Sequence, residues 1–319
     1  MKSAILYLVI PCYNEQEVLP ITAPEFKNQL LSLIEKGKIS KKSKILFVND
    51  GSKDNTWEII SRLSKEDNIF KGISLSRNKG HQNALIAGLE ESVKYGADIT
   101  VSIDCDGQDD ITVIENMVDE YINGADIVYG VRKDRKSDTL LKRTTALGFY
   151  KFLKLMGVET VYNHADYRLL SKRVLEAFSD YKEVNLYLRG MFQLVGFKST
   201  AVYYTRTTRL AGKTHYPFKK MMSLAIDGIT SFSVKPIRII TALGFFVALL
   251  SFVGIAWSVI AHFLNKTVSG WSSIVSIICF VSGVQLLSLG VVGEYIGKIY
   301  MEVKARPRYI ISERTDDIK

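Results

Sequence analysis

The segment "TVSIDCDGQDD", residues 100–110, places four aspartates directly after a run of mostly apolar and β-branched residues. The first half predicts a buried strand, and the second half is an acidic loop with Asp104, Asp106, Asp109 and Asp110. Neighbouring carboxylates repel one another, so such a loop costs stability unless positive charge lies among them. A divalent cation would supply that charge. A solvated acidic turn is the more common explanation for an isolated D-x-D, so the rest of the chain has to decide between the two.

Short apolar runs of the same kind alternate with segments of helical periodicity. The expected strands lie at residues 6–10, 44–48, 70–76, 98–103 and 126–130. The segments 56–66 and 81–96 lie between them and have apolar residues at helical spacing. This alternation predicts an α/β fold with a mostly parallel sheet and helices on both faces. In such a sheet, ligands bind at the carboxyl ends of the strands.

Polar loops follow the first four expected strands: "PCYNE", "NDGSKDNT", "RNKGHQ" and "DCDGQDD". Four polar loops at one edge of a sheet predict a binding site more strongly than any single loop does. None of them contains the glycine pattern of a dinucleotide fold or a P-loop, which excludes a nucleotide-dependent oxidoreductase of the usual kind. We therefore expect phosphate to be bound through a cation that the aspartates hold.

Two long apolar stretches, residues 239–264 and 274–296, follow the mixed N-terminal part. Each is long enough to cross a hydrocarbon core of about 30 Å as a helix. Basic residues flank the outer ends of this hairpin, whereas the connector carries only Lys266. The positive-inside rule therefore predicts a multi-pass plasma-membrane protein whose two termini and N-terminal domain are cytoplasmic. The net charge of +9 fits contact with anionic lipid, and no nucleic-acid-binding module is present.

The expected organisation has four parts. They are a cytoplasmic domain at 1–212, an interfacial amphipathic segment at 213–238, a transmembrane hairpin at 239–297 and a cytoplasmic tail at 298–319, which frays from residue 312. Residues 140–157 have the spacing of an amphipathic helix, either on a membrane surface or on the protein core. We also expect the hairpin to help chains associate as a homo-oligomer, for example a tetramer.

The sequence carries a family resemblance in a series of motifs. Four of them occur in order in the first half: "VIPCYNEQEVL", "VNDGSKDNT", "SRNKGHQNAL" and "SIDCDGQD". They resemble the GT-A domain of family 2 glycosyltransferases. Four later ones narrow the resemblance to the polyprenyl-phosphate glycosyltransferases, such as bactoprenol glucosyltransferases and dolichyl-phosphate mannose synthase: "ADYRLLSKRVLEAF", "LAGKTHYP", "DGITSFSVKPIRI" and "GEYIGKIYMEVKARPRYI". The resemblance covers nearly the whole chain.

The resemblance implies a reaction, a cofactor and partners. A hexose, most often glucose from UDP-glucose, would move to undecaprenyl phosphate with inversion, giving a lipid-linked sugar for cell-envelope glycan modification. UDP-N-acetylglucosamine and other nucleotide sugars remain alternatives. The reaction would need a divalent cation, Mg²⁺ or Mn²⁺.

The resemblance also implies roles for particular residues. The donor-binding set is Pro11, Tyr13, Glu15, Asp50, Arg77, Gly80, Asp104, Asp106 and Gln108. Within it, Asp106 would be the catalytic metal ligand, Gln108 would assist, and Asp104 would reach the ribose or a metal-bound water. Asp166 would be a catalytic base or orienting carboxylate, and Arg168 beside it either acts in the site or forms a structural ion pair.

The acceptor phosphate would be bound by Arg132, Arg143, Arg206 and Arg209, because a planar guanidinium suits bidentate contact with phosphate. A solvated basic face is the alternative for all four. The acidic loop departs from the family pattern: Asp110 and Ile111 replace the usual prolines, and Gly107 stands where leucine is common. These departures leave the shape of the loop open.

Two other functions compete with this one. A processive polysaccharide synthase would carry a Q-x-x-R-W motif and more membrane spans, and the sequence has neither. A non-catalytic membrane scaffold would have no reason to keep Asp50, Asp104, Asp106 and Asp166 together. A polyprenyl-phosphate glycosyltransferase is therefore the favoured interpretation.

Overall fold

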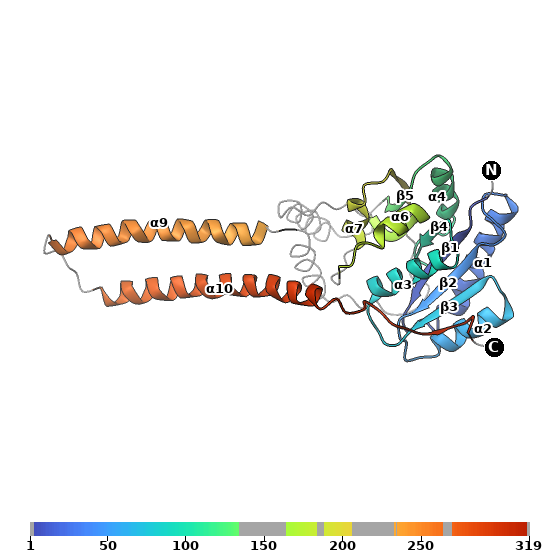
Figure 1. The fold of residues 1–319 in the computed structure, drawn as a ribbon, viewed down its shortest axis with the longest axis horizontal. Helices are drawn as coiled ribbons and strands as arrows, with labels where there is room; N and C mark the ends of the chain where they lie inside the picture. Colours follow the sequence, from blue (N-terminus) through green and yellow to red (C-terminus); the bar gives the residue numbers. More distant parts are fainter. Residues whose placement is uncertain are drawn as a thin grey trace. The chain divides into compact units, whose positions relative to one another are not determined.

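The computed structural model describes residues 3–133, 164–183, 188–205, 233, 235–263 and 270–317. These residues form two compact units (Figure 1). The first contains a β-sheet with its helices and includes the C-terminal residues from Ala305, and the second contains two long helices. The predicted helix at 140–157 and most of the predicted interfacial segment lie outside the described residues.

The sheet is built around four parallel strands. Among the described residues it has eight strands, in the order β7-β5-β6-β4-β1-β2-β3-β8. Neighbouring strands β4-β1-β2-β3 are parallel, as are β5 and β7, whereas β6 and β8 run antiparallel to their neighbours. The strands are β1 (Leu6–Cys12), β2 (Lys44–Asn49), β3 (Phe70–Leu75), β4 (Ile99–Ser102), β5 (Ile127–Arg132), β6 (His164–Ser171), β7 (Ser199–Tyr204) and β8 (Ile311–Arg314). The predicted α/β class and the five predicted strands are confirmed.

Helices cover both faces of this sheet, as predicted. They are α1 (Leu19–Glu35), α2 (Thr56–Glu66), α3 (His81–Lys94), α4 (Val113–Ile122), α6 (Lys172–Phe178) and α7 (Leu188–Leu194). On one face, Leu8 of β1 belongs to a core cluster with Phe26 of α1 and Met117 of α4. On the other face α3 approaches so closely that a Cβ on Gly88 would lie 2.4 Å from Val9 Cγ1 and 2.7 Å from Val48 Cγ2.

The C-terminal segment is part of the sheet, so the prediction that it frays from residue 312 is wrong for the described residues. β8 pairs antiparallel with the edge of β3, with Arg314 opposite Ile73. Outside the strand ladder, Trp57 Nε1 donates a hydrogen bond of 3.0 Å to Glu313 Oε2. The predicted cytoplasmic tail at 298–319 therefore includes a strand that completes the sheet.

Two neighbouring glutamates of α3 hold this C-terminal segment. Glu90 accepts hydrogen bonds from Arg308 Nη2 at 3.1 Å and from Tyr309 Oη. The buried Glu91 accepts from Lys94 Nζ at 2.6 Å and from Arg314 Nε at 3.2 Å. Burial alone would raise the pKa of Glu91, but these hydrogen bonds outweigh it and lower the pKa below its usual value.

Glu91→Gln tests the contribution of this contact to stability. Because the folded-state pKa of Glu91 is lowered, its ionised form stabilises the fold above the unfolded pKa of about 4.3, and this contribution is lost as pH falls through the folded pKa. We expect the variant to lose about 1–3 kcal/mol at pH 7 and less below pH 4, measured by denaturant unfolding in detergent. Exposed Glu66→Gln is the matched control; an equal loss in both variants would contradict the assignment.

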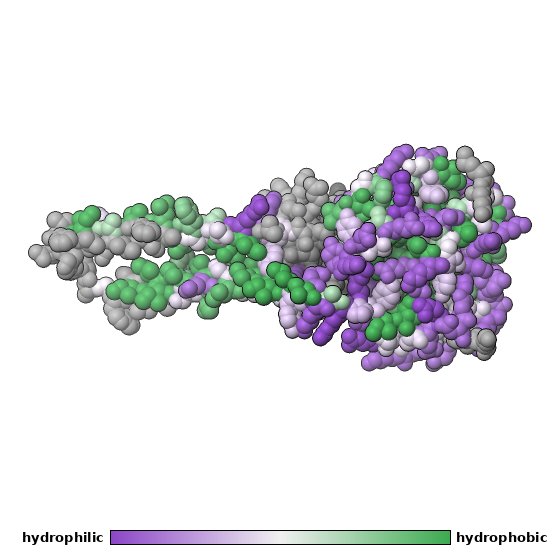
Figure 2. Space-filling model, in the orientation of Figure 1, coloured by the Kyte–Doolittle hydropathy of each residue, from purple (hydrophilic) through white to green (hydrophobic). Residues whose placement is uncertain are grey.

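The second unit consists of α9 (Lys235–Phe263) and α10 (Trp271–Val303). Tyr295 Oη of α10 donates a hydrogen bond of 2.5 Å to Ser233 O, just before α9. Apolar side chains along both helices are exposed, for example Phe245 and Leu286, and Figure 2 shows green atoms over much of their described length. Such surfaces need an apolar environment or a partner.

One stretch of the described residues, Phe280–Val303, is long and apolar enough to cross a bilayer by its length and composition. It lies further toward the C-terminus than the second predicted span, residues 274–296. The first predicted span, residues 239–264, is helical as far as Phe263.

Candidate active site

The loops after β2 and β3 are joined by a buried carboxylate. Asp50, at the end of β2, accepts hydrogen bonds from the backbone N–H groups of Lys79 at 2.7 Å and Gly80 at 2.9 Å. Desolvation raises the pKa of Asp50, and these two N–H groups and His81 oppose that rise. The predicted donor residues Asp50 and Gly80 are therefore in direct contact.

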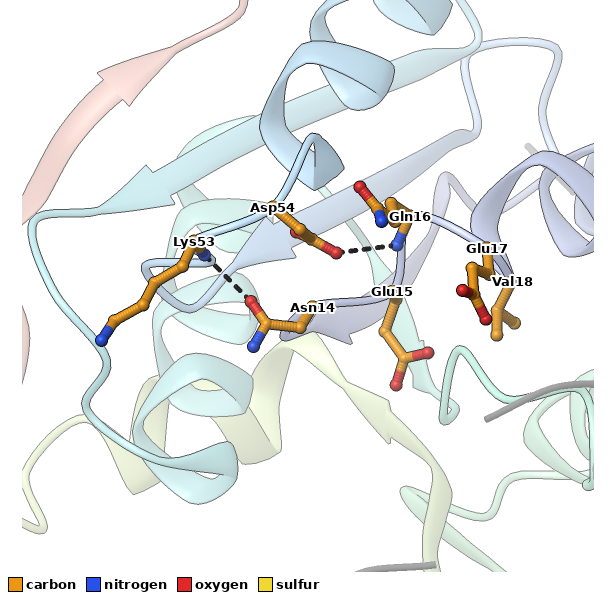
Figure 3. Close-up of a pocket in the computed structure, with 7 residues that line it drawn as sticks. All are labelled: Asn14, Glu15, Gln16, Glu17, Val18, Lys53 and Asp54. Carbon is orange, nitrogen blue, oxygen red and sulfur yellow. Dashed lines mark hydrogen bonds between the residues drawn. The ribbon is translucent and has the colours of Figure 1, made fainter. Parts of the chain in front are cut away.

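The loops after β1 and β2 are joined in a similar way. Asn14 Oδ1 accepts from Lys53 N at 2.9 Å, and Asp54 Oδ2 accepts from Gln16 N at 3.2 Å (Figure 3). Glu15 lies between them, and Figure 3 shows its side chain among those that line a pocket of about 360 Å³. The first two polar loops thus form one surface.

The acidic loop after β4 faces β6 across a histidine. His81 Nε2, at the start of α3, lies 3.7 Å from Asp104 Oδ1 and 3.6 Å from Asp166 Oδ2. Ser102 Oγ donates a hydrogen bond of 2.6 Å to Asp166 O, which fixes β6 beside the end of β4. Desolvation raises the pKa of Asp104; His81 lowers it, and the neighbouring carboxylates, Asp109 first, raise it further.

Asp166 is oriented by a buried arginine. The Arg168 side chain is 0% exposed, and its Nη2 donates to Asp166 Oδ1 while its Nη1 donates to Leu188 O at 3.1 Å. Gln82 Nε2 lies 3.5 Å from the other oxygen, Asp166 Oδ2, and Gln82 Oε1 accepts from Leu188 N at 3.0 Å. Arg168 therefore forms the structural ion pair that was one of its two expected roles, and it fixes the carboxylate.

Gly107 makes the turn of the acidic loop. Its φ is 68°, a left-handed conformation that leucine adopts only with strain. Asp106 Oδ1 accepts from Gln108 N at 3.1 Å across this turn. The replacement of the family's leucine by glycine thus has a backbone reason.

Two hydrogen bonds fix the loop where the family's prolines are missing. Tyr167 Oη donates to Asp110 O at 3.0 Å. Asp110 Oδ1 accepts from Thr112 N at 2.9 Å, just before α4. In this chain, hydrogen bonds to Asp110 therefore hold the part of the loop where the family has prolines.

Asp109, another carboxylate of the acidic loop, contacts residues at the ends of β5 and β7. Asp109 Oδ1 accepts a hydrogen bond of 2.6 Å from Tyr204 Oη and lies 3.5 Å from Arg132 Nη2. Arg132 Nε in turn lies 3.3 Å from Tyr204 Oη. The structure thus connects the acidic loop with Arg132, one of the predicted phosphate-binding arginines.

The predicted metal ligands are compatible with a hard cation. Among the described residues, no group of three His, Cys, Asp or Glu side chains is arranged to hold an ion. Asp104, Asp106 and Gln108 nevertheless offer carboxylate and amide oxygens on one loop. Mg²⁺ is commonly held by one or two carboxylates together with substrate phosphates, so this donor set fits an ion that arrives with a nucleotide.

The remaining predicted residues are placed as follows. Pro11 lies in β1 beside Val48, and the side chains of Tyr13 and Arg77, in the loops after β1 and β3, are exposed. Arg143, Arg206 and Arg209 lie outside the described residues.

Three residues of the site were missed by sequence reasoning: His81, Gln82 and Tyr204. Asp109 was named as part of the acidic loop, but its contact with Arg132 was not predicted. His81 and Gln82 lie in a polar loop that the sequence did flag, so their position was visible although their role was not. Tyr204 ends β7, which was not predicted.

Comparisons with known proteins identify the family. The model of Glycosyl transferase family 2 matches residues 7–178, and that of the GtrB C-terminal hairpin matches residues 235–299. A bactoprenol glucosyl transferase of Shigella phage SfX is 40% identical over 312 residues, which cover 96% of this chain and 98% of that protein. The uncharacterized glycosyltransferase YkoT of Bacillus subtilis (strain 168) is 50% identical over 307 residues, covering 96% of this chain and 91% of that protein.

Among solved structures, glucosyl-3-phosphoglycerate synthase from Mycobacterium tuberculosis, in complex with Mn²⁺, UDP-glucose and phosphoglyceric acid, is similar with a TM-score of 0.43. It is 15% identical, and the match covers 71% of this chain and 78% of that one. The chain belongs to glycosyltransferase family 2, and it is a glycosyltransferase with a GtrB-type hairpin.

Arg168→Gln tests the buried ion pair against a matched exposed one. Arg173 Nη2 makes a similarly close pair with Asp126, but the Arg173 side chain is 64% exposed. Removing one partner of a buried pair costs about 3–5 kcal/mol, whereas an exposed pair contributes about 0–1 kcal/mol. We expect Arg168→Gln to lower the free energy of unfolding by about 3–5 kcal/mol and Arg173→Gln to leave it nearly unchanged. Equal losses in denaturant unfolding would contradict this.

Proposed function

We propose that this glycosyltransferase moves glucose from UDP-glucose to undecaprenyl phosphate, with inversion at the anomeric carbon. One observation carries the proposal: the acidic loop of Asp106 and Gln108 is connected through Asp109 to the guanidinium of Arg132. Oxygen ligands suited to a cation–diphosphate group thus lie beside a group suited to a second phosphate. The name of the phage relative, bactoprenol glucosyl transferase, supports both the sugar and the lipid.

The donor would lie along the first four loops. Pro11, Tyr13, Glu15, Asp50, Arg77 and Gly80 would bind the nucleoside, and Asp104, Asp106 and Gln108 the diphosphate end. A bound Mg²⁺ or Mn²⁺ would stabilise the charge of the leaving diphosphate. The contacts of Asp50 with Lys79 N and Gly80 N support this assignment, because they hold the second and third loops in fixed relation.

The acceptor would need orientation more than activation. A phosphate monoester already carries negative charge at pH 7, so its oxygen can attack the anomeric carbon as the bond to UDP breaks. Asp166, held by Arg168, would orient the reacting groups rather than remove a proton. Arg132, with Arg143, Arg206 and Arg209, would bind the lipid phosphate.

The hairpin would anchor the enzyme at the surface where the lipid phosphate lies. We propose that both termini and the catalytic domain are cytoplasmic and that the hairpin also supports a homo-oligomer. The exposed apolar side chains of α9 and α10 support burial in lipid. A hairpin of this size offers no pathway for the sugar, so a separate protein would move the lipid-linked product across the membrane.

A transfer assay tests the reaction. Purified protein in detergent is incubated with undecaprenyl phosphate and labelled UDP-glucose, UDP-N-acetylglucosamine or UDP-galactose, and lipid-soluble label is counted. We expect label from UDP-glucose, its loss with EDTA, and a fall of at least about 100-fold in Asp106→Asn, because the leaving diphosphate loses its charge stabilisation.

Asp119→Asn is the control, since Asp119 lies on α4, pairs with Lys38 after α1 and is outside the polar loops. Transfer of label from a different UDP-sugar would change the proposed sugar and leave the rest of the proposed reaction unaltered. An absence of transfer from every donor by correctly folded protein would favour the non-catalytic scaffold.

Cysteine labelling tests the orientation. In intact bacterial cells, a membrane-impermeant maleimide should label Ser269→Cys in the connector and should not label Glu66→Cys on α2 until the cells are permeabilised. The opposite pattern would reverse the proposed topology.

A further inference from the structure

Arg132 is held in place by two buried side chains. The Asp109 side chain is only 1% exposed, and Tyr204 is 2% exposed. Neither can rely on water, so the Asp109 carboxylate has to be compensated by protein groups. Tyr204 Oη at 2.6 Å and Arg132 Nη2 at 3.5 Å supply that compensation. The Arg132 side chain itself is 26% exposed, so it extends from the buried pair toward solvent.

The strand pairing leaves this group little freedom. Arg132 and Tyr204 lie opposite each other on the parallel strands β5 and β7, and Lys133 N donates to Tyr204 O at 2.8 Å. The Tyr204 ring packs edge-on against Tyr167, with centroids 5.4 Å apart. Desolvation and the Asp109 charge raise the pKa of Tyr204, so its hydroxyl keeps the proton that it donates. Backbone, ring and hydroxyl of Tyr204 are thus all fixed.

The same two tyrosines hold the acidic loop. Tyr204 binds the side chain of Asp109, and Tyr167 binds the backbone carbonyl of Asp110. Asp109 directly follows Gln108, the last residue of the predicted metal-binding set. If the acidic loop moves, the Asp109 carboxylate, which contacts Arg132, moves with it.

We propose that Asp109 and Tyr204 are positioning residues for the acceptor: they hold the Arg132 guanidinium where it binds the phosphate of the polyprenyl substrate. The pair also fixes the distance between this arginine and the loop of Asp106 and Gln108, so that the two phosphate-bearing substrates are held in register. The inference rests on the proposed role of Arg132 in acceptor binding.

Equilibrium binding tests the proposal without requiring turnover. The probe is farnesyl phosphate, a short polyprenyl monophosphate, titrated against the full-length protein in detergent, with UDP as the second ligand. Tyr204→Phe removes only the hydroxyl. We expect its Kd for farnesyl phosphate to rise about tenfold, the size of one lost charge-assisted hydrogen bond. The Kd for UDP should change much less, because the hydrogen bond from Tyr167 to Asp110 O still holds the acidic loop.

Two controls separate positioning from general damage. Tyr203→Phe removes the hydroxyl of the neighbouring residue, which is 56% exposed, and should leave both Kd values unchanged. Tyr204→Phe combined with Arg132→Gln should bind farnesyl phosphate no more weakly than Arg132→Gln alone, because Tyr204 acts through Arg132. If Tyr204→Phe does not fold, as judged by lost UDP binding, Asp109→Asn replaces it in the same comparison.

Equal farnesyl phosphate affinity in wild type and Tyr204→Phe would overturn the proposal. So would additive losses in the double variant, or no binding by the wild type. If the binding differences are found but no UDP-sugar supports transfer, the proposed reaction fails while the positioning of Arg132 stands.

Discussion

The structure of the site depends on the cost of burying carboxylates at the end of a sheet. Asp50, Asp109 and Asp166 leave water almost completely, and an uncompensated buried charge costs several kcal/mol. Each has a different compensation: backbone N–H groups for Asp50, a tyrosine and an arginine for Asp109, and a buried arginine for Asp166. The partners of Asp50 and Asp109 come from other loops and strands, and Arg168, on the same strand as Asp166, also bonds Leu188 O of α7. Satisfying these charges therefore fixes the loops relative to one another.

The fold could be predicted where local pattern and tertiary environment agree. β1 to β5 are short apolar runs, buried as strands of a sheet covered by helices should be, and α2 and α3 show helical spacing. β6 and β8 escaped prediction because they carry charges that only tertiary contacts neutralise. Arg168 is fully buried against Asp166 and Leu188, and Arg314 pairs with Glu91 of a distant helix. The local sequence of a charged segment does not indicate such distant partners.

The same division applies to the site. The aspartates of the acidic loop were visible because they follow a strand, and Asp50 because it lies in a neighbouring loop. The contacts of His81 and Tyr204 arise from the pairing of elements far apart in the sequence, and spacing alone does not reveal them. The missing prolines left the shape of the acidic loop open, and in the structure Tyr167 and the Asp110 side chain hold it through hydrogen bonds.

The residues of β8 follow both hairpin helices in the chain, so the ribosome makes them after the hairpin. Until Ile311–Arg314 has been synthesised, the edge of β3 exposes N–H and C=O groups that invite pairing with other chains. During the same interval Glu90 and Glu91 lack Arg308 and Arg314. The sheet is therefore completed only after both hairpin helices have been translated, so the final step in folding the first unit has to wait for residues that follow the second unit in the chain.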